Sequence, residues 1–229
     1  EYFLFEFDKK DTFLERNEFL SMVERTEMLR MKYGELNVEF QKFFAYQTLE
    51  PFYKRECVKL DSNSNIDEID SFCKRHKEFF AKTLRGGCGI GARIINCSDF
   101  PTVKKVVSSL LSDAPAWILE ELICQGGFFS NLNPSSVNTI RVPSFRKGND
   151  VVIVEPVMRM GRKGSVIDNA AGGGIIASID VNNGEVVTEA YDEKGNQYAT
   201  HPDSGIRIKD QFIPEWNALL SLVRQVHLK

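Results

Sequence analysis

The sequence predicts an α+β fold with a large, mainly antiparallel sheet, and three observations support this prediction. Apolar residues recur at helical spacing in the first quarter of the chain, whereas short apolar runs alternate with glycine-rich turns from Phe79 onward. Several of those runs are joined by hairpin turns, which connect antiparallel strands. An amphipathic pattern over residues 214–227 predicts a closing helix.

The same change of pattern divides the chain. Residues 1–60 are expected to form a helical N-terminal segment, and residues 61–229 a larger domain. Within that domain we expect a small subdomain over residues 61–118, which carries a glycine loop, and a larger sheet subdomain over residues 119–229. A chain of 229 residues is long enough for one or two domains with a buried core.

Local signals predict the individual elements. The polar run 61–65 predicts a turn that caps a short helix over residues 66–73. Ser98 or Asp99 is expected to cap a second helix that runs to about Leu111. The apolar runs predict strands over residues 79–82, 93–96, 117–123, 138–145, 151–160 and 174–180, with hairpin turns over residues 147–150 and 182–184.

The composition is that of an ordinary globular protein, with 42% hydrophobic and 27% charged residues. A net charge of −3 argues against a nucleic-acid partner bound through general basicity. No apolar run reaches the roughly 18 residues of a membrane helix, and the first residues lack the features of a signal peptide. The five cysteines are irregularly spaced, so free thiols in a reducing cytoplasm are expected.

The most informative stretch is the glycine loop that follows Lys82. Glycine permits positive φ and lets successive backbone N–H groups approach one anion, and a lysine just before the loop can add a point charge. The loop is neither a Walker loop nor a good dinucleotide fingerprint. A plain hairpin turn is the alternative interpretation. The glycines that would approach a phosphate are Gly86, Gly87, Gly89 and Gly91.

A second candidate segment is the apolar strand over residues 117–125, which contains two adjacent glutamates. Adenine needs a flat apolar slot with backbone hydrogen-bonding groups along its edge, and a carboxylate can accept hydrogen bonds from ribose hydroxyls. Glu120, Glu121, Leu122 and Ile123 are therefore candidates for purine binding. The alternative is that the two glutamates lie on the solvated face of the strand.

Two later strands each carry an arginine among apolar neighbours, Arg141 and Arg159. A guanidinium in such a place needs an anionic partner, and its planar fork suits a phosphate or a carboxylate. Alternation along the strand places Arg141 on the same face as Thr139. A structural ion pair is the alternative for each arginine. Further along, Asp168 and Asn169 offer a carboxylate and an amide before a glycine triplet.

Taken in this order, the motifs resemble the ATP-grasp fold. The resemblance is greatest to the branch called sugar-transfer associated ATP-grasp, which is related to the α-L-glutamate ligase-like proteins. The stretches that carry it are AKTLRGGCGIG, WILEELICQ, LNPSSVNTIRV, VMRMG, GSVIDNAAGGG and HPDSG. The resemblance implies two α+β subdomains with mainly antiparallel sheets that enclose ATP between them.

The resemblance also implies a role for each candidate residue. Lys82 would contact phosphate, and the loop glycines would cover the phosphates. Residues 120–123 would line adenine and ribose. Arg141 and Arg159 would lie near the γ-phosphate and the acyl-phosphate, and Asn169 near metal and phosphate.

The implied reaction is ATP-dependent carboxylate–amine ligation through an acyl-phosphate, with ATP and Mg²⁺ as cofactors. The partners would be a small-molecule, sugar or peptide carboxylate and an amine acceptor. The family relationship implies cell-surface polysaccharide or exopolysaccharide biosynthesis. Two alternatives stay open: a non-catalytic nucleotide- or partner-binding module, and a kinase that phosphorylates a hydroxyl.

The chain departs from the ATP-grasp pattern in three places. Thr83 follows Lys82 where the family has proline, which an extended backbone tolerates. Lys42 matches an earlier nucleotide lysine, but it follows glutamine rather than aspartate. The acidic residue and the Glu-x-Asn motif that hold Mg²⁺ are not found after His201, so the metal ligands stay unknown. We therefore expect a chain cut before that motif, or a degenerate relative.

Overall fold

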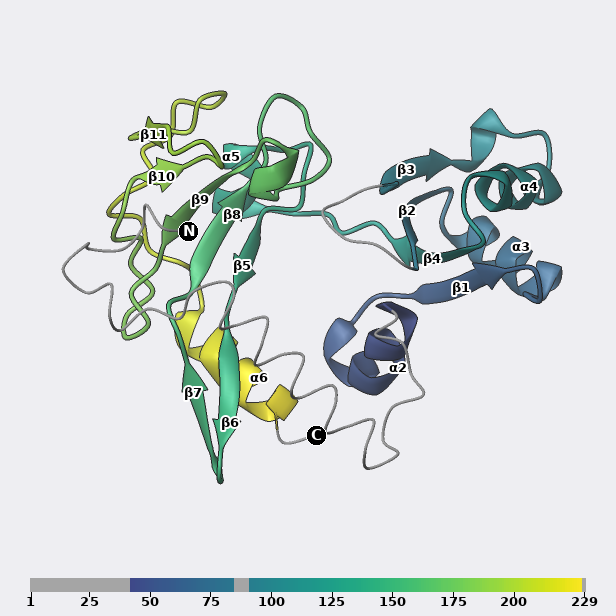
Figure 1. Ribbon diagram of the computed structural model, residues 1–229. Coiled ribbons are helices and arrows are strands. Elements are labelled where there is room, and N and C mark those ends of the chain that lie inside the picture. Colours follow the sequence, from purple (N-terminus) through teal and green to yellow (C-terminus); the bar gives the residue numbers. More distant parts are fainter. Residues whose placement is uncertain (1–41, 85–90, 228–229) are drawn as a thin grey trace.

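The computed structural model describes residues 42–84 and 91–227, and it confirms the predicted α+β fold class. The predicted sheet is divided into a four-stranded sheet, a five-stranded sheet and a two-stranded hairpin, all of them antiparallel. The two larger sheets lie in two bodies side by side (Figure 1). The predicted helical pattern before residue 42 lies outside the described residues.

The first sheet has the strand order β1-β4-β2-β3. Its strands and the helices around it are β1 (Cys57–Asp61), β2 (Glu78–Thr83), β3 (Arg93–Asn96), β4 (Ala116–Glu121), α2 (Lys42–Tyr53), α3 (Ile66–Arg75) and α4 (Val103–Asp113). On one face, Phe79 from β2 and Leu110 from α4 are buried in a common core. On the opposite face, Ile118 from β4 packs with Phe43 from α2. The sheet is therefore covered by helices on both faces.

The second sheet has the order β11-β10-β9-β8-β5. The elements of this body are α5 (Gly127–Leu132), β5 (Thr139–Arg141), β6 (Ser144–Lys147), β7 (Asp150–Ile153), β8 (Val157–Met160), β9 (Ile175–Ser178), β10 (Ala190–Tyr191), β11 (Gln197–Tyr198) and α6 (Trp216–His227). Leu132 from α5 and Trp216 from α6 share a buried core with Met158 from β8. Each body thus has a hydrophobic core of its own.

The predicted strands over residues 138–145 and 151–160 are too long, because each contains a proline. Pro143 separates β5 from β6, and Pro156 separates β7 from β8. Proline has no N–H to donate to a strand ladder, so it ends a strand inside a sheet. As a result, β5 pairs with β8, while β6 and β7 leave the sheet as a separate hairpin.

The helix expected to start at Ser98 or Asp99 begins only at Val103. The physical reason is Pro101, because a residue that precedes proline is disfavoured in the α region. Phe100 is accordingly extended, with φ −125° and ψ 136°, and the helix can form only after it. The predicted capping residues therefore do not cap this helix.

The expected helical N-terminal segment extends too far, because its last residues belong to strand β1. The sequence predicts a helical segment up to residue 60, whereas residues 57–60 form a strand in which Cys57 pairs with Glu120 of β4. The expected boundaries at 60/61 and 118/119 both fall inside strands of this sheet. The short helix predicted after the polar run is confirmed as α3, and the Asn65 side chain caps it by accepting from the Asp67 N–H at 2.9 Å.

A short link, residues 122–126, connects β4 of the first body to α5 of the second (Figure 1). Gln125 in this link makes two hydrogen bonds with the backbone of Asn138. Its Nε2 donates to the carbonyl oxygen at 2.7 Å, and its Oε1 accepts from the N–H at 2.9 Å. The link is therefore fastened to the segment that leads into β5.

Candidate functional site

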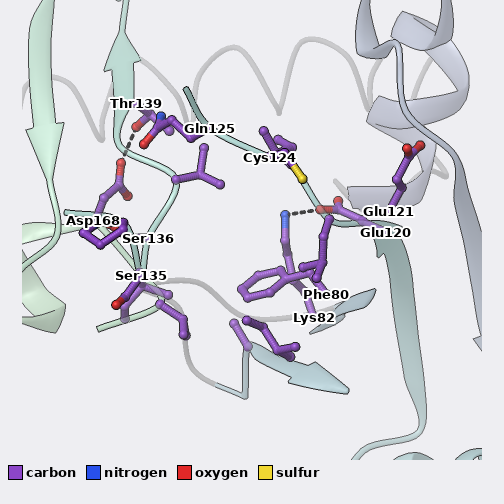
Figure 2. Close-up of a pocket in the computed structure, with 18 of the residues that line it drawn as sticks. Phe80, Lys82, Glu120, Glu121, Cys124, Gln125, Ser135, Ser136, Thr139 and Asp168 are labelled. Atoms are coloured by element: carbon purple, nitrogen blue, oxygen red, sulfur yellow. Dashed lines mark hydrogen bonds and ion pairs between the residues drawn. The ribbon is translucent and has the colours of Figure 1, made fainter. Parts of the chain in front are cut away.

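A pocket of about 490 Å³ lies between the two bodies. Its walls come from β2, β3 and β4 on one side, from the link, and from β5, β8 and the segment around Asp168 on the other. Figure 2 shows Lys82 and Glu120 on the first wall and Thr139 and Asp168 on the second, across the cavity from each other. The pocket therefore combines chemistry from both bodies.

The first wall is built by alternation along β2 and β4. Phe80 pairs with Glu120 in the antiparallel register, and Lys82 follows Phe80 on the same face. The Lys82 Nζ lies 2.6 Å from the Glu120 Oε2, and Glu120 is only 4% exposed. A buried carboxylate needs such a partner. The predicted alternative of a solvated strand face is therefore wrong for Glu120.

Glu121 points the other way from its neighbour. Its carboxylate accepts a hydrogen bond from the Glu56 N–H at 3.0 Å, and its own N–H donates to the Glu56 carbonyl oxygen at 2.9 Å. Glu121 contributes to the lining of the pocket, but its carboxylate is directed away from the cavity (Figure 2). Of the two predicted glutamates, only Glu120 presents its carboxylate to the pocket.

The link contributes apolar side chains to the lining of the pocket. Leu122 and Ile123 both line the pocket, and Ile123 is 45% exposed. The exposed thiol of Cys124 lies in the same wall. Apolar side chains of this kind suit a planar heterocycle. The structure therefore brings the predicted purine-binding segment into the same pocket as Lys82.

The second wall is organised around Asp168, which the sequence analysis noted beside Asn169 but to which it assigned no role in the site. Asp168 is 7% exposed, and its two carboxylate oxygens accept from the Thr139 Oγ1 at 2.5 Å and from the Arg159 Nη2 at 2.7 Å. Thr139 and Arg159 are paired in the β5–β8 register, so both face Asp168. The signal was available in the sequence, because a strand arginine needs a carboxylate and Asp168 stands in the glycine-rich motif.

Asn169 also lines the pocket, but its side-chain oxygen is engaged in the turn that follows. That oxygen accepts from the Gly172 N–H at 3.0 Å and caps a 3₁₀ turn over Ala170–Gly172. The glycines of this motif have a steric reason as well. A Cβ on Gly174 would overlap with the Asp168 carbonyl group, so only glycine lets the chain pass so close to Asp168.

Arg141 is not among the residues that line the pocket. It lies two residues beyond Thr139 on the same face of β5, and it is exposed. Gly91 does not line the pocket either; its φ of +74° turns the chain toward β3. The loop glycines Gly86, Gly87 and Gly89 lie outside the described residues. Of the three predicted cations, the structure brings two, Lys82 and Arg159, into one cavity.

A comparison with known protein families identifies the family of this chain. The family model described as sugar-transfer associated ATP-grasp matches residues 46–229, which is more than half of the chain. The chain belongs to this ATP-grasp family. The predicted resemblance is therefore confirmed. No curated protein matches the sequence.

Solved structures that are similar to this ATP-grasp chain include the following two proteins. One is D-alanyl-alanine synthetase A from Vibrio cholerae, with 10% identity and a TM-score of 0.38 over 83% of this chain and 66% of that chain. The other is the D-alanine-D-alanine ligase from Coxiella burnetii, with 12% identity and a TM-score of 0.36 over 82% and 56%. The chain thus spans less than two thirds of the length of either protein.

Lys42, which the sequence analysis compared with an earlier nucleotide lysine of the ATP-grasp family, lies next to this pocket. Its Nζ donates to the Thr83 carbonyl oxygen at 2.5 Å, at the end of β2. Burial lowers the pKa of Lys42, the nearby ammonium of Lys82 lowers it further, and the Glu120 carboxylate acts in the opposite direction. The two lysines are therefore close enough to repel each other.

The acidic side chains of the pocket include those of Glu120, Glu121 and Asp168. Among residues 42–84 and 91–227, no group of three or more His, Cys, Asp or Glu side chains could hold a metal ion. The carboxylates of Glu120 and Asp168 are already paired with Lys82 and Arg159. The described residues therefore do not fit a Mg²⁺ ion held by the protein alone.

Within the same residues, no helix is both long and apolar enough to cross a membrane.

Proposed function

We propose that this chain is part of an ATP-dependent ligase that joins a carboxylate to an amine through an acyl-phosphate. One observation carries the proposal. Lys82 from the first sheet and Arg159 from the second line the same pocket, so a polyphosphate placed between them would touch a cation from each body. The family to which the chain belongs supports the use of ATP.

The pocket suits the shape and polarity of a nucleotide. Its volume of about 490 Å³ falls within the usual range for small-molecule sites. Phe80, Ile94 and Ile123 offer apolar surface for a base, and the Glu120 carboxylate can accept from a hydroxyl or an amino group. The phosphates would then extend toward Lys82 and Arg159. Gly91 and the loop glycines before it are proposed to cover them.

In the first step, a carboxylate oxygen of the substrate attacks the γ-phosphorus of ATP. The bond between that phosphorus and the bridging oxygen breaks, and ADP leaves. The cations Lys82 and Arg159 hold the phosphoryl group in line and offset its charge. Because a guanidinium has five N–H donors, Arg159 can donate to a phosphate while Asp168 keeps it in place.

In the second step, an amine nitrogen attacks the acyl carbon, the carbon–oxygen bond to phosphate breaks, and the amine gives up a proton. Arg141 and Asn169 are proposed to act near the acyl-phosphate end of the site. Arg141 is exposed beside the pocket, where it can meet a bulky carboxylate substrate. The family is described as sugar-transfer associated, which supports a carboxylate substrate linked to a sugar or a peptide. The protein is proposed to act on this substrate in the cytoplasm, in polysaccharide biosynthesis.

The binding part of the proposal is tested by thermal unfolding with and without MgATP. A ligand at 100 times its Kd stabilises the folded state by about 2.7 kcal/mol, which raises the Tm. Lys82→Ala and Arg159→Ala should each remove most of that rise. Lys59→Ala is the matched control for Lys82, because Lys59 lies in the same sheet, outside the pocket, and is paired with Asp61 at 2.7 Å. Equal stabilisation of all four proteins would contradict the proposal.

The reaction itself is tested by its products. With ATP, a carboxylate substrate and hydroxylamine, a ligase of this kind releases ADP and traps the acyl-phosphate as a hydroxamate. Phosphate transfer to a hydroxyl would instead give a stable phosphorylated product, which identifies a kinase. Binding without release of ADP would identify a non-catalytic module. Either of these two results would overturn the ligase assignment.

A further inference from the structure

Arg55, between α2 and β1, lines the pocket but has no part in the function proposed above. Its Nη2 lies 3.3 Å from the Glu120 Oε2, and its guanidinium carbon lies 4.4 Å from the centre of the Tyr53 ring. The side chain is 20% exposed. A guanidinium stacked on an aromatic ring is held in a fixed plane, with its N–H edge available to an acceptor.

The charges around Arg55 do not balance. The same oxygen of Glu120 is paired with both Arg55 and Lys82. Two cations thus share a single carboxylate oxygen. Like charges held together at a partly buried site repel each other, and an added anion relieves that repulsion.

The other carboxylates near Arg55 are engaged elsewhere. Glu56, the next residue, is paired with Arg75 and with His76, whose Nε2 lies 2.8 Å from it. The Glu121 carboxylate accepts from the Glu56 N–H. Within the part of the chain that the structure describes, these groups therefore leave the excess positive charge beside Glu120 in place.

Arg55 also carries a buried donor that the described residues do not satisfy. Its Nε is buried and has no hydrogen-bond partner among them. A buried donor left without an acceptor costs about 1–3 kcal/mol, so such groups are usually paired with a ligand or water. The Nη2 of the same guanidinium is 3.3 Å from a carboxylate that Lys82 already holds at 2.6 Å. The guanidinium of Arg55 can therefore donate to further acceptor oxygens placed beside Glu120.

We propose that Arg55 is a phosphate-binding residue of this pocket, acting next to Lys82 on the same polyphosphate. The proposal rests on the proposed function only in taking that ligand to be ATP. Because Arg55 and Lys82 share one Glu120 oxygen, their nitrogens are close enough to contact one phosphate group or two adjacent ones. The Tyr53 ring holds the guanidinium in position before the ligand arrives.

A purely structural role for Arg55 would be to tie the end of α2 and the start of β1 to β4. The two roles predict different dependence on the ligand. A phosphate contact responds to the charge of the ligand, whereas a structural tie affects every ligand of the pocket by the same factor. The experiment therefore compares ligands with and without phosphate rather than ATP alone.

The test measures the affinity of the parent protein, Arg55→Ala and Arg55→Lys for ATP, adenosine and inorganic pyrophosphate by calorimetry. Arg55→Ala should weaken ATP and pyrophosphate about tenfold or more and adenosine less than twofold. Arg55→Lys should lie between, because it keeps the charge but loses the planar fork. The matched control is Arg93→Ala. Arg93 also stacks on an aromatic ring, Trp117 at 4.9 Å, and pairs with a carboxylate, but it does not line the pocket.

Each outcome decides a separate question. Equal weakening of ATP and adenosine, or no weakening of either, overturns the role of Arg55 and leaves the proposed function standing. Arg55-dependent binding of pyrophosphate by a parent protein that does not bind ATP overturns the proposed function and supports Arg55. A parent protein that binds neither ATP nor pyrophosphate overturns both.

Discussion

Each of the two pocket cations contributed by a strand has a buried carboxylate as its partner. Glu120 holds Lys82, and Asp168 holds Arg159. A long flexible side chain loses rotamer entropy when it is fixed, so a partner that fixes it in advance lowers the cost of binding a ligand. The two carboxylates are therefore best understood as positioning residues for their cations.

Asp168→Asn tests this view at the second wall. The change weakens the charge-assisted bond from Arg159 and removes the charge that balances the guanidinium. We expect the free energy of unfolding to fall by about 1–3 kcal/mol, because hydrogen bonds to charged groups contribute on that scale. Urea unfolding measures it. The control is Asp113→Asn, in an exposed pair with Arg93, where the loss should stay below about 1 kcal/mol.

A second readout separates positioning from packing at Asp168. If Asp168 positions Arg159, the affinity for ATP falls in Asp168→Asn even where the protein is fully folded. An unchanged Kd for ATP, in a variant whose stability has fallen, would show that Asp168 only stabilises the fold.

At the same scale, the sequence could predict which residue types meet in the pocket but not how each one points. The Glu-Glu pair was identified, yet only the register of β2 against β4 shows that Glu120 faces Lys82 while Glu121 faces Glu56. Arg55 had no sequence signal, because its neighbours are ordinary charged residues before a strand. Such orientations depend on tertiary packing rather than on local spacing.

At the scale of elements, a buried polar network joins the link to the second sheet. Asn138 is its centre and is 4% exposed. Its side-chain oxygen accepts from the Gly161 N–H at 2.9 Å, and its Nδ2 donates to the carbonyl oxygens of Phe129 at 2.7 Å and Asn133 at 3.1 Å. These bonds hold α5, β8 and the segment before β5 in one arrangement, and hence the second wall of the pocket.

Asn138→Ala should therefore be among the most damaging single changes in this body. It leaves the Gly161 N–H and two carbonyl oxygens buried without this partner, and each such group costs about 1–3 kcal/mol. We expect a loss of about 3 kcal/mol in the free energy of unfolding, measured by urea denaturation. Asn149→Ala, in the exposed turn between β6 and β7, should change it by no more than about 0.5 kcal/mol. Similar losses for both variants would contradict this role of Asn138.

The elements themselves were largely predictable, because turns and caps are local signals. Gly148, with φ +64°, makes the predicted turn between β6 and β7, and Asn65 caps α3 as expected. The two strands that were predicted too long each contain a proline that interrupts an apolar run. Periodicity alone cannot show that Pro143 and Pro156 divide two long runs into four strands that belong to different sheets.

The HPDSG motif shows a related limit. It helped to identify the family, but its residues serve the fold of the second body. His201 is fully buried, and its Nε2 lies 2.9 Å from the Gly161 carbonyl oxygen. Asp203 accepts from the Lys163 N–H at 2.6 Å. The hydrogen bonds of this motif thus stabilise the turn that follows β8, the strand that contains Arg159.

At the scale of the whole molecule, the described residues form two bodies with separate cores, which both line the pocket and are connected by a short link from β4 to α5. This design places the cations that would grip a polyphosphate on different bodies. The family resemblance predicted this enclosure, whereas composition and periodicity predicted only the α+β class. We therefore expect a nucleotide to bind in this pocket, against the link.

The most direct test uses the thiol of Cys124, which is exposed and lies in the pocket wall. Its rate of alkylation at pH 8 is measured by site-resolved mass spectrometry, with and without saturating MgATP. Cys57 provides an internal control, because burial raises its pKa to about 11 and keeps it unreactive in both conditions. If the nucleotide lies against the link, ATP should slow labelling of Cys124 at least tenfold. If ATP raises the Tm but leaves the labelling rate of Cys124 unchanged, the nucleotide binds elsewhere, which contradicts binding in this pocket.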